Sequence, residues 1–324
     1  MDLLNKRILY IGPVYFHYDK AVINKLIELG AQVYPFELYP SSVYFKLLRK
    51  LKLPILKNYI FNFYNKLLTK KNYDYVLVRH GHVLDIELLK NLRKNNSKAR
   101  FVNFHWDSIK PDYNYVSLIK YFDKVFSFDY KDCQAHEGLH YLPLFFLDEY
   151  AHHRKNENNI QKEFDLLFIG SWRNIERWNL VKKADNICKQ NQLRFYYFLH
   201  YSFKAQFDSI KKGVLARDSI NKSLSHNEIL NFFSKSHCII DFPSSFQTGL
   251  TMRTFETLGA GKKLITTNKN IINEPFYNPE FISIIDPENF KLDIDFIRTP
   301  PVTSMEEKIN NYSIKNYLFN LLKE

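Results

Sequence analysis

The sequence has few glycines, few cysteines and no long hydrophobic run. Its 324 residues include nine glycines and three cysteines, Cys133, Cys188 and Cys238, which lie far apart and form no Cys-x-x-Cys pattern. The cysteines therefore do not indicate a disulfide scaffold or a structural zinc site, and they favour a reducing compartment. No apolar segment approaches the ~20 residues that a membrane-spanning helix needs. The first residues, MDLLNKRILYIGP, lack the long apolar core of a signal peptide. These absences predict a cytoplasmic protein.

Acidic residues are missing from residues 38–73, where eight basic residues stand among aromatic and aliphatic ones. The net charge of the chain is +12 at pH 7, which indicates either an anionic partner or a compositional bias toward Lys, Asn, Ile, Phe and Tyr. A basic amphipathic segment is typical of proteins that lie on anionic membranes. We therefore expect residues 43–71, divided into two helices by Pro54, to contact the inner face of the cytoplasmic membrane. The alternative is helices packed on their own sheet with lysines in solvent.

Short apolar segments alternate with helical patterns along the chain, which predicts parallel strands joined by helices. In the first half the strands are RILYIG, AQVYPFEL, YDYVLVR, ARFVNFHW, KVFSFD and HYLPLFF; in the second half they are FDLLFIG, LRFYYFLH, HCIIDFP, KKLITT and FISIID. The polar stretch 151–163 has the composition of a linker. We expect two doubly wound α/β domains, 1–150 and 164–324, with a cleft between them. A last helix, opened by Ser304 after a Pro-Pro break, could pack back on the first domain.

Three of the nine glycines fall within thirteen residues of SSFQTGLTMRTFETLGAGKKLITT (244–267). The segment follows the strand HCIIDFP, and ligands of open α/β sheets bind beyond the carboxyl ends of the strands, where helix N-termini attract anions. Gly249 would let a phosphate approach the backbone, and Arg253 could offer its planar fork to a diphosphate. Glu256 could accept both hydroxyls of a ribose. The alternative is an exposed ion pair on a helix capped by glycines.

GLTMRTFETLGAGKKLIT resembles the donor-site segment of group-1 glycosyltransferases with the GT-B architecture. TTNKNIINEPFYNPEFISIID and KVFSFDYKDCQAHEGLHYLPLFF are similar to segments of the CgeB-like, capsule and lipopolysaccharide glycosyltransferases. The resemblance implies two Rossmann-like domains facing across a cleft, a nucleotide-sugar donor, and no metal or other cofactor. It places Glu256 at the family's second glutamate, which holds the ribose. Thr248 stands where the family has its first acidic residue, so this sequence departs from the pattern there.

The loop after FDLLFIGSW resembles the phosphate-side loop of the same donor domain, so Gly170, Ser171 and Arg173 are expected to face the diphosphate. A solvated arginine at the next helix N-terminus is the alternative for Arg173. That place is unfavourable for a cation that has no anionic partner.

The first domain is expected to bind the acceptor and to supply any base. FVNFHWDSIKP places His105 and Asp107 at a strand end, and Asp107 is the first candidate base, with His105 the second. Arg79 and His80 follow another strand. Two further acceptor contacts are expected in the first turn of the chain, at Tyr15 and His17. As alternatives, Asp107 caps the following turn, and a histidine of the pair at 80 and 82 packs in the core.

The resulting hypothesis is transfer of a sugar from a nucleoside-diphosphate sugar, with UDP favoured, to a hydroxyl of a lipid-linked surface polysaccharide or lipopolysaccharide. Retention of the anomeric configuration is favoured over inversion, on the group-1 resemblance. A second hypothesis is an inactive GT-B scaffold or membrane-binding subunit, to which Thr248 lends support. A nucleic-acid partner is not expected, because no recognised nucleic-acid-binding module is present. The acidic triplet DID at 293–295 resembles a metal-binding motif of another glycosyltransferase fold and is treated as chance, so no metal site is expected.

Overall fold

The computed structural model describes residues 3–14, 16–51, 53–68, 72–155, 160–214, 223–301 and 303–323. The chain divides into two compact units. Unit 1 comprises Met1–Pro143 together with Ile314–Glu324, and unit 2 comprises Leu144–Ser313. The division therefore falls before the boundary at 150 that the sequence suggests, and the last helix belongs to unit 1.

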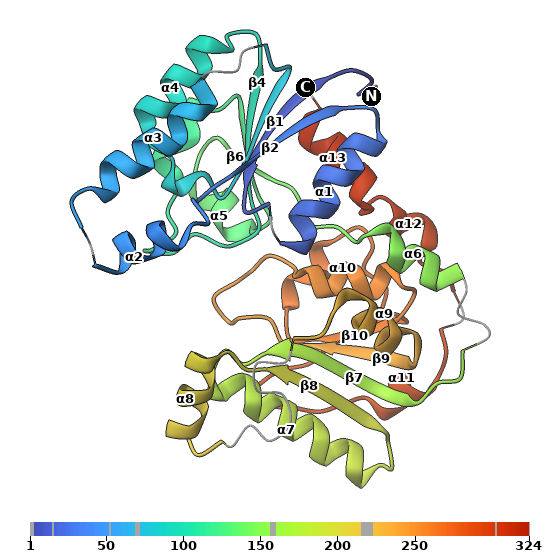
Figure 1. The fold of residues 1–324 in the computed structure, drawn as a ribbon. Coiled ribbons are helices and arrows are strands. Elements are labelled where there is room, and N and C mark those ends of the chain that lie inside the picture. The colour runs from blue at the N-terminus through green and yellow to red at the C-terminus, as the bar shows by residue number, and fades with distance from the viewer. Residues whose placement is uncertain are drawn as a thin grey trace. The chain divides into compact units, whose positions relative to one another are not determined.

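Unit 1 is built on six parallel strands in the order β2-β1-β3-β4-β5-β6 (Figure 1). Its strands are β1 Arg7–Gly12, β2 Gln32–Glu37, β3 Tyr75–Arg79, β4 Arg100–His105, β5 Lys124–Ser127 and β6 Leu139–Tyr141. Its helices are α1 His17–Glu28, α2 Val43–Leu51, α3 Leu56–Leu68, α4 Ile86–Asn95, α5 Tyr130–Ala135 and α13 Ile314–Leu322, with 3-10 turns η1 Gly81–Val83 and η2 Val116–Tyr121.

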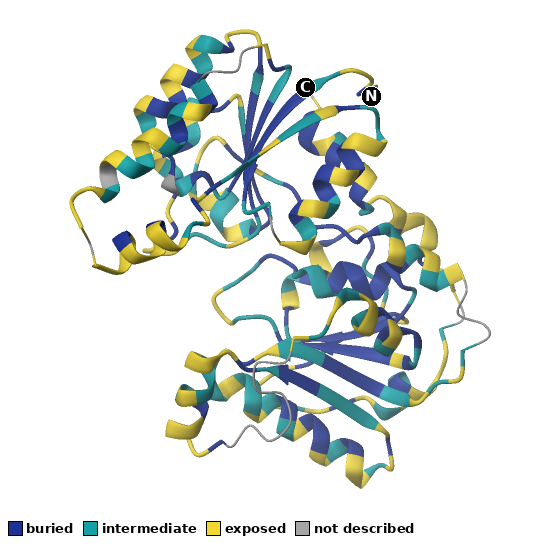
Figure 2. Cartoon of the chain, in the orientation of Figure 1, coloured by how far each residue is buried: buried dark blue, intermediate teal, exposed yellow. Residues whose placement is uncertain are grey.

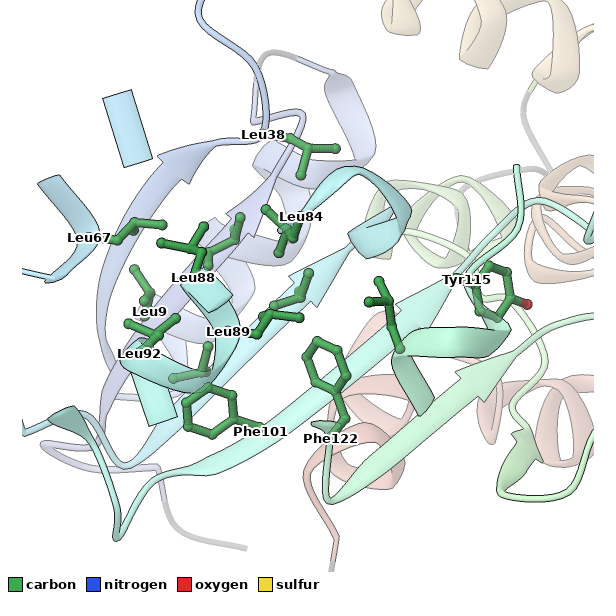
Figure 3. Packing of buried hydrophobic residues seen from close by; sticks show 14 of the residues in the cluster. Leu9, Leu38, Leu67, Leu84, Leu88, Leu89, Leu92, Phe101, Tyr115 and Phe122 are labelled. Atoms are coloured by element: carbon green, nitrogen blue, oxygen red, sulfur yellow. The ribbon is translucent and has the colours of Figure 1, made fainter. Parts of the chain in front are cut away.

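The sheet of unit 1 is covered on both faces, as expected for parallel strands that are apolar along most of their length. Figure 3 shows Leu67 of α3 and Leu88 and Leu92 of α4 packed with Leu9 and Phe101 of the sheet. On the opposite side of the sheet, α1 and α13 contact each other (Figure 1). The two helix layers hold the sheet in place, and with it the strand ends that carry the candidate acceptor residues.

Unit 2 has five parallel strands in the order β11-β10-β9-β7-β8. They are β7 Phe164–Ser171, β8 Phe195–His200, β9 Ser236–Asp241, β10 Lys263–Thr266 and β11 Ile282–Ile284. The other elements are α6 Asp148–Lys155, α7 Ile175–Gln190, α8 Phe203–Lys211, α9 His226–Ser234, α10 Met252–Gly259, η4 Lys269–Asn273, α11 Ile294–Arg298 and α12 Glu306–Asn310. None of the described helices of either unit is long and apolar enough to cross a membrane.

The two sheets share one connectivity: the second strand, then the first, third, fourth and fifth. In each unit the strand order reverses next to the first strand, between β1 and β3 and between β7 and β9. Such a switch point is where open α/β sheets bind ligands. Two doubly wound α/β domains are expected from the sequence, and the strand order of both sheets agrees with that expectation.

Two expected elements differ from those found, and one observed helix is not expected. The polar stretch taken as a linker begins inside helix α6, whose Tyr150 is fully buried. The helix expected from Ser304 is two helices, α12 and α13, which belong to different units. Helix α8 is not expected from the sequence, because its apolar residues face outward and give no buried periodic face.

Candidate functional site

A pocket of about 730 Å³ lies over the carboxyl ends of β7, β9, β10 and β11 in unit 2. This volume is in the range of small-ligand sites. Its wall includes the start of α7 and the loops after the four strands, with Arg173, Arg177, Ser244, Thr248, Asn268 and Asp286 among the lining residues. The pocket therefore occupies the place where the sequence predicts a donor site.

The loop after β7 brings Arg173 to the pocket. Gly170 lies against the Phe168 ring, because a Cβ at this position would stand 2.8 Å from Phe168 Cζ. Arg173 is exposed and lines the pocket. Asn174 then caps α7 by accepting a hydrogen bond from the Arg177 backbone N–H at 3.0 Å. The first turn of α7 therefore lies at the pocket, with the positive end of a sixteen-residue helix.

Arg177 is a pocket residue that the sequence analysis missed. Its Nη1 donates to the Ser171 carbonyl at 3.2 Å and its Nη2 donates to the Phe242 carbonyl. It thereby ties the loop after β7 to the loop after β9, across the switch point. Burial lowers the pKa of its guanidinium from the usual value, while the nearby Asp241 carboxyl acts in the opposite direction. No sequence signal marks it, since an arginine in the first turn of a helix is indistinguishable from a solvated one.

Thr248 lines the pocket, whereas Gly249 is buried beside it. The Asn268 side-chain amide donates to the carbonyls of Thr248 and Gly249, at 3.2 and 3.1 Å. Asn270 also donates to the Thr248 carbonyl, at 3.2 Å. The loop after β9 is therefore held by two asparagines of the loop after β10, and the backbone near Gly249 is fixed by these bonds.

Helix α10 begins later than the sequence suggests, at Met252 with Thr251 as its N-cap. The Thr251 hydroxyl donates to Asp241 Oδ2 at 2.6 Å and accepts from the Thr254 backbone N–H at 3.3 Å. Burial raises the pKa of Asp241, and the Thr251 hydrogen bond opposes that rise. Asp241 at the end of β9 is a second residue that the sequence analysis did not single out.

Arg253 and Glu256 are paired with each other and are not among the residues that line the pocket. Arg253 Nη1 lies 2.7 Å from Glu256 Oε2, and Glu256 is only 2% exposed. The Arg253 guanidinium also stands over the Phe233 ring, 5.1 Å from its centroid. Burial and the nearby Glu256 carboxylate raise the pKa of the Tyr150 hydroxyl. The pair is neither the exposed ion pair nor the open ligand contact that the sequence suggests.

The glycines around this helix serve its packing. A Cβ on Gly259 would lie 2.4 Å from Cγ of Phe146, so only glycine allows α10 and the Phe146 ring to approach this closely. Gly261 ends the segment with a φ of +72°, a left-handed conformation that suits glycine. Packing explains Gly259 and backbone conformation explains Gly261, so neither glycine requires a bound phosphate as its reason.

In unit 1 the expected acceptor residues lie after β1 and at the end of β3, and the two base candidates lie at the end of β4. Tyr15 lies outside the described residues. His17 is exposed at the start of α1. Arg79 is nearly buried: its Nε donates to Asp19 Oδ1 at 2.6 Å, and its guanidinium lies 4.3 Å from the Trp106 ring centroid. Arg79 is thus committed to a buried ion pair and is not free to bind an acceptor.

His105 is 1% exposed, which argues against it as the catalytic base. Its ring is stacked on Tyr115, with centroids 3.3 Å apart, and its Nδ1 lies 2.7 Å from the Tyr113 hydroxyl. Burial lowers the pKa of its imidazole well below the usual range. It is a neutral core histidine.

Asp107 and His80 meet at the same strand edge. The Asp107 side chain is 58% exposed, and its Oδ2 lies 3.6 Å from His80 Nε2. Burial and the charge of Arg79 lower the pKa of His80 to about 3, so its ring is neutral at pH 7 and the contact is not an ion pair. His80 stands in the left-handed region with φ +58°. Of the two base candidates, Asp107 is the one that solvent reaches.

Within the described parts of the chain, no three histidine, cysteine or acidic side chains are grouped so that they could hold a metal ion. In the triplet DID at 293–295, Asp293 caps α11 by accepting from the Phe296 backbone N–H at 2.9 Å. The cysteines Cys133, Cys188 and Cys238 are free thiols.

No protein-family model matches the sequence, and no curated protein matches it. Solved structures do resemble the fold. An alpha-glucosyltransferase in complex with UDP and a 13-mer DNA containing a central A:G mismatch has a TM-score of 0.55 at 13% identity, over 97% of this chain and 94% of that one. A UDP-GlcNAc 2-epimerase from Neisseria meningitidis, bound to UDP-GlcNAc, has a TM-score of 0.50 at 11% identity, over 98% of this chain and 99% of that one. Two parallel α/β units and these likenesses give the chain the GT-B fold.

Proposed function

We propose that the protein is a glycosyltransferase that takes its sugar from a nucleoside-diphosphate sugar, with UDP as the favoured nucleotide. The observation that carries the proposal is the pocket at the switch point of unit 2, where Arg173 and the N-terminus of α7 meet. A diphosphate fits this combination, since it accepts hydrogen bonds from free backbone N–H groups and a bidentate contact from arginine. The structures that share the fold are described with UDP and with UDP-GlcNAc, which supports the choice of nucleotide.

In the proposed reaction the bond between the anomeric carbon and a diphosphate oxygen breaks, and the diphosphate keeps the electron pair. The acceptor oxygen bonds to the anomeric carbon while its proton passes to a base. Arg173 and the α7 dipole would stabilise the charge that develops on the leaving diphosphate. Asp107 is our proposed proton acceptor, because it is an exposed carboxylate at the expected edge of unit 1. The group-1 resemblance favours retention at the anomeric carbon.

We also propose the ribose contact that the resemblance assigns to Glu256, on the condition that its ion pair with Arg253 opens. Because Glu256 is paired with Arg253 and buried, its carboxylate reaches a ligand only if the ion pair opens. Thr248, which replaces the family's first acid, does line the pocket.

The proposed acceptor is a saccharide on a lipid carrier, approached through α2 and α3. Val43, Leu47 and Leu51 lie four residues apart on α2 and are exposed, Val43 to 82%. Exposed Arg49 and Lys50 follow on the same helix. An exposed apolar stripe beside basic residues is suited to an anionic membrane surface, which would hold the enzyme near such an acceptor.

The experiment is the thermal stability of the full chain with UDP, GDP, CMP and ADP in turn, since a ligand that binds the folded state raises the melting temperature. A shift with one nucleotide, lost in Arg173→Ala and retained in Lys189→Ala, would support the donor site. Lys189 is a matched control because it lies in the last turn of the same helix and is exposed.

Absence of a shift with all four nucleotides would contradict an active enzyme and favour the scaffold hypothesis. A shift in melting temperature without sugar transfer to lipid-linked acceptors would indicate that the protein binds nucleotide but is not an active transferase. Because a neighbour in fold is described with DNA and the net charge is +12, DNA belongs among the acceptors tested.

A further inference from the structure

Helix α8 of unit 2 exposes an apolar stripe. Phe203, Phe207 and Ile210 are spaced four and three residues apart and are 69%, 68% and 48% exposed. At about 100° per residue they fall on one side of the helix, within an arc of ~60°. Figure 2 shows α8 as largely exposed, in yellow. Two phenylalanines that are each about two thirds exposed on one helix face are more than the single exposed apolar residues that soluble surfaces ordinarily carry.

The other side of α8 is fastened to unit 2, so the orientation of the stripe is fixed. Trp172 Nε1 donates to Asp208 Oδ2 at 3.0 Å, and Ser209 is buried. Ala205 packs against the core of the unit. These contacts turn Phe203 and Phe207 away from the core of unit 2. The stripe is therefore a surface feature of the folded unit.

The charges beside the stripe are positive. Lys204, Lys211 and Lys212 are all exposed. Asp208 is the one acidic residue between 203 and 212, and it is occupied by Trp172 and by Lys212 at 3.3 Å. Three lysines against one aspartate leave a net charge of two positive units on this segment. Lys204 and Lys211 fall on the same flank of the stripe at helical spacing.

We propose that α8 is a membrane-binding element of unit 2, whose aromatic stripe enters the headgroup region of an anionic bilayer while its lysines contact lipid phosphates. The buried apolar area sets the strength of such binding, and the basic flank makes it selective for anionic lipid. This surface is separate from the α2 stripe of unit 1, and its action does not depend on glycosyl transfer. Through Trp172, which precedes the pocket residue Arg173, it is joined to the wall of the donor pocket.

The test is co-sedimentation of the full chain with phosphatidylcholine vesicles that contain phosphatidylglycerol, and with phosphatidylcholine vesicles alone. The variants are Phe203→Ser/Phe207→Ser and Lys204→Gln/Lys211→Gln. Ile27→Ser/Ile272→Ser is the matched control, because it removes two exposed apolar side chains that lie outside α8. Circular dichroism and the melting temperature check the fold, and the UDP-induced shift reports on the donor site independently.

We expect the phenylalanine variant to lose at least about tenfold in binding to anionic vesicles, since burial of one aromatic side chain is worth that much. The lysine variant should lose binding to anionic vesicles and leave binding to neutral ones unchanged, and the control should bind as wild type. Wild-type binding by the phenylalanine variant would overturn the proposal. So would a loss of self-association in sedimentation velocity with vesicle binding unchanged, which would assign the stripe to a second copy of the chain.

Discussion

Arg253 and Glu256 form a nearly buried ion pair in unit 2, with Arg253 Nη1 2.7 Å from Glu256 Oε2. Two residues that a local pattern suggests as ligand contacts are thus joined to each other. Replacing either residue is therefore expected to change the stability of unit 2, which would obscure any effect on ligand binding. Arg173, which lines the pocket, is the better residue to replace in a binding test.

We expect Glu256→Ala to lower the free energy of unfolding by about 3–5 kcal/mol, because it leaves the Arg253 charge without its carboxylate in a site of low solvent access. Urea denaturation measures the change. The control is Glu163→Ala, which breaks the more exposed pair with Lys235 and should cost about 1 kcal/mol or less. Equal losses in the two variants would contradict the importance of burial.

Arg173→Ala is expected to leave the urea midpoint unchanged and to weaken nucleotide binding about 10- to 100-fold, the range for losing a charge-assisted hydrogen bond. Calorimetric titration with UDP measures the dissociation constant. If Arg173→Ala binds as tightly as Lys189→Ala, the diphosphate does not lie at the start of α7.

Gly259→Ala should destabilise unit 2 although alanine favours helices. The new Cβ would stand 2.4 Å from Cγ of the buried Phe146 ring, an overlap of the kind that costs about 1–3 kcal/mol. In the double variant Gly259→Ala/Phe146→Ala the losses should be less than additive, because the overlap is removed. Additive losses in urea denaturation would show that the ring is not the obstacle.

His80 should make stability fall in mild acid. Its pKa is lowered to about 3 in the folded protein, whereas an unfolded histidine has a pKa of about 6.5. Between these values the unfolded chain binds a proton that the folded protein does not, so stability is full above pH 6.5 and is lost as the pH falls. From pH 7 to 5 this group contributes a loss of about 2 kcal/mol.

The variant His80→Asn should reduce that pH-dependent loss by the same amount, and asparagine tolerates the left-handed backbone at this position. Urea denaturation at pH 7 and pH 5 gives the difference. His140→Asn, at an exposed histidine, is the control and should keep the wild-type difference. A His80→Asn protein with an undiminished loss would show that other groups carry it.

Val43→Ser/Leu47→Ser on α2 should reduce binding to vesicles that contain phosphatidylglycerol, because it shortens the exposed apolar stripe of unit 1. Phe45→Ser is the informative contrast, since Phe45 is buried on the inner side of α2 and its loss should lower stability rather than binding. Vesicle binding that survives the first change would refute the α2 surface.

Much of the fold follows from local patterns. RILYIG coincides with β1, Pro54 falls between α2 and α3, and Asn174 caps α7. Ser225 and Glu228, three residues apart, form a capping box at the start of α9. These features depend on neighbours in sequence, which is why the sequence alone reveals them.

The site is less predictable, because its residues are placed by distant elements. Glu256 lies beside Tyr150 of α6, and its partner Arg253 lies over the Phe233 ring of α9. No local pattern shows that packing. The alternation of side chains along β4 does predict the burial of His105, because His105 lies on the same strand face as the buried Phe101. Arg177 and Asn268 act by bridging loops from different strands, a role that spacing cannot reveal.

The return of the chain to unit 1 sets an order for synthesis. Unit 2 is one continuous segment, so all of its residues are translated before those of α13. Until then α1 lacks the helix that contacts it, and Trp106 lacks the Tyr317 hydroxyl that accepts its hydrogen bond at 2.9 Å. Domains ordinarily finish in the order in which they are translated. Here the unit whose translation begins first is the unit whose last helix is translated last, so a chain that stops after Ser313 has all of unit 2 but only part of unit 1.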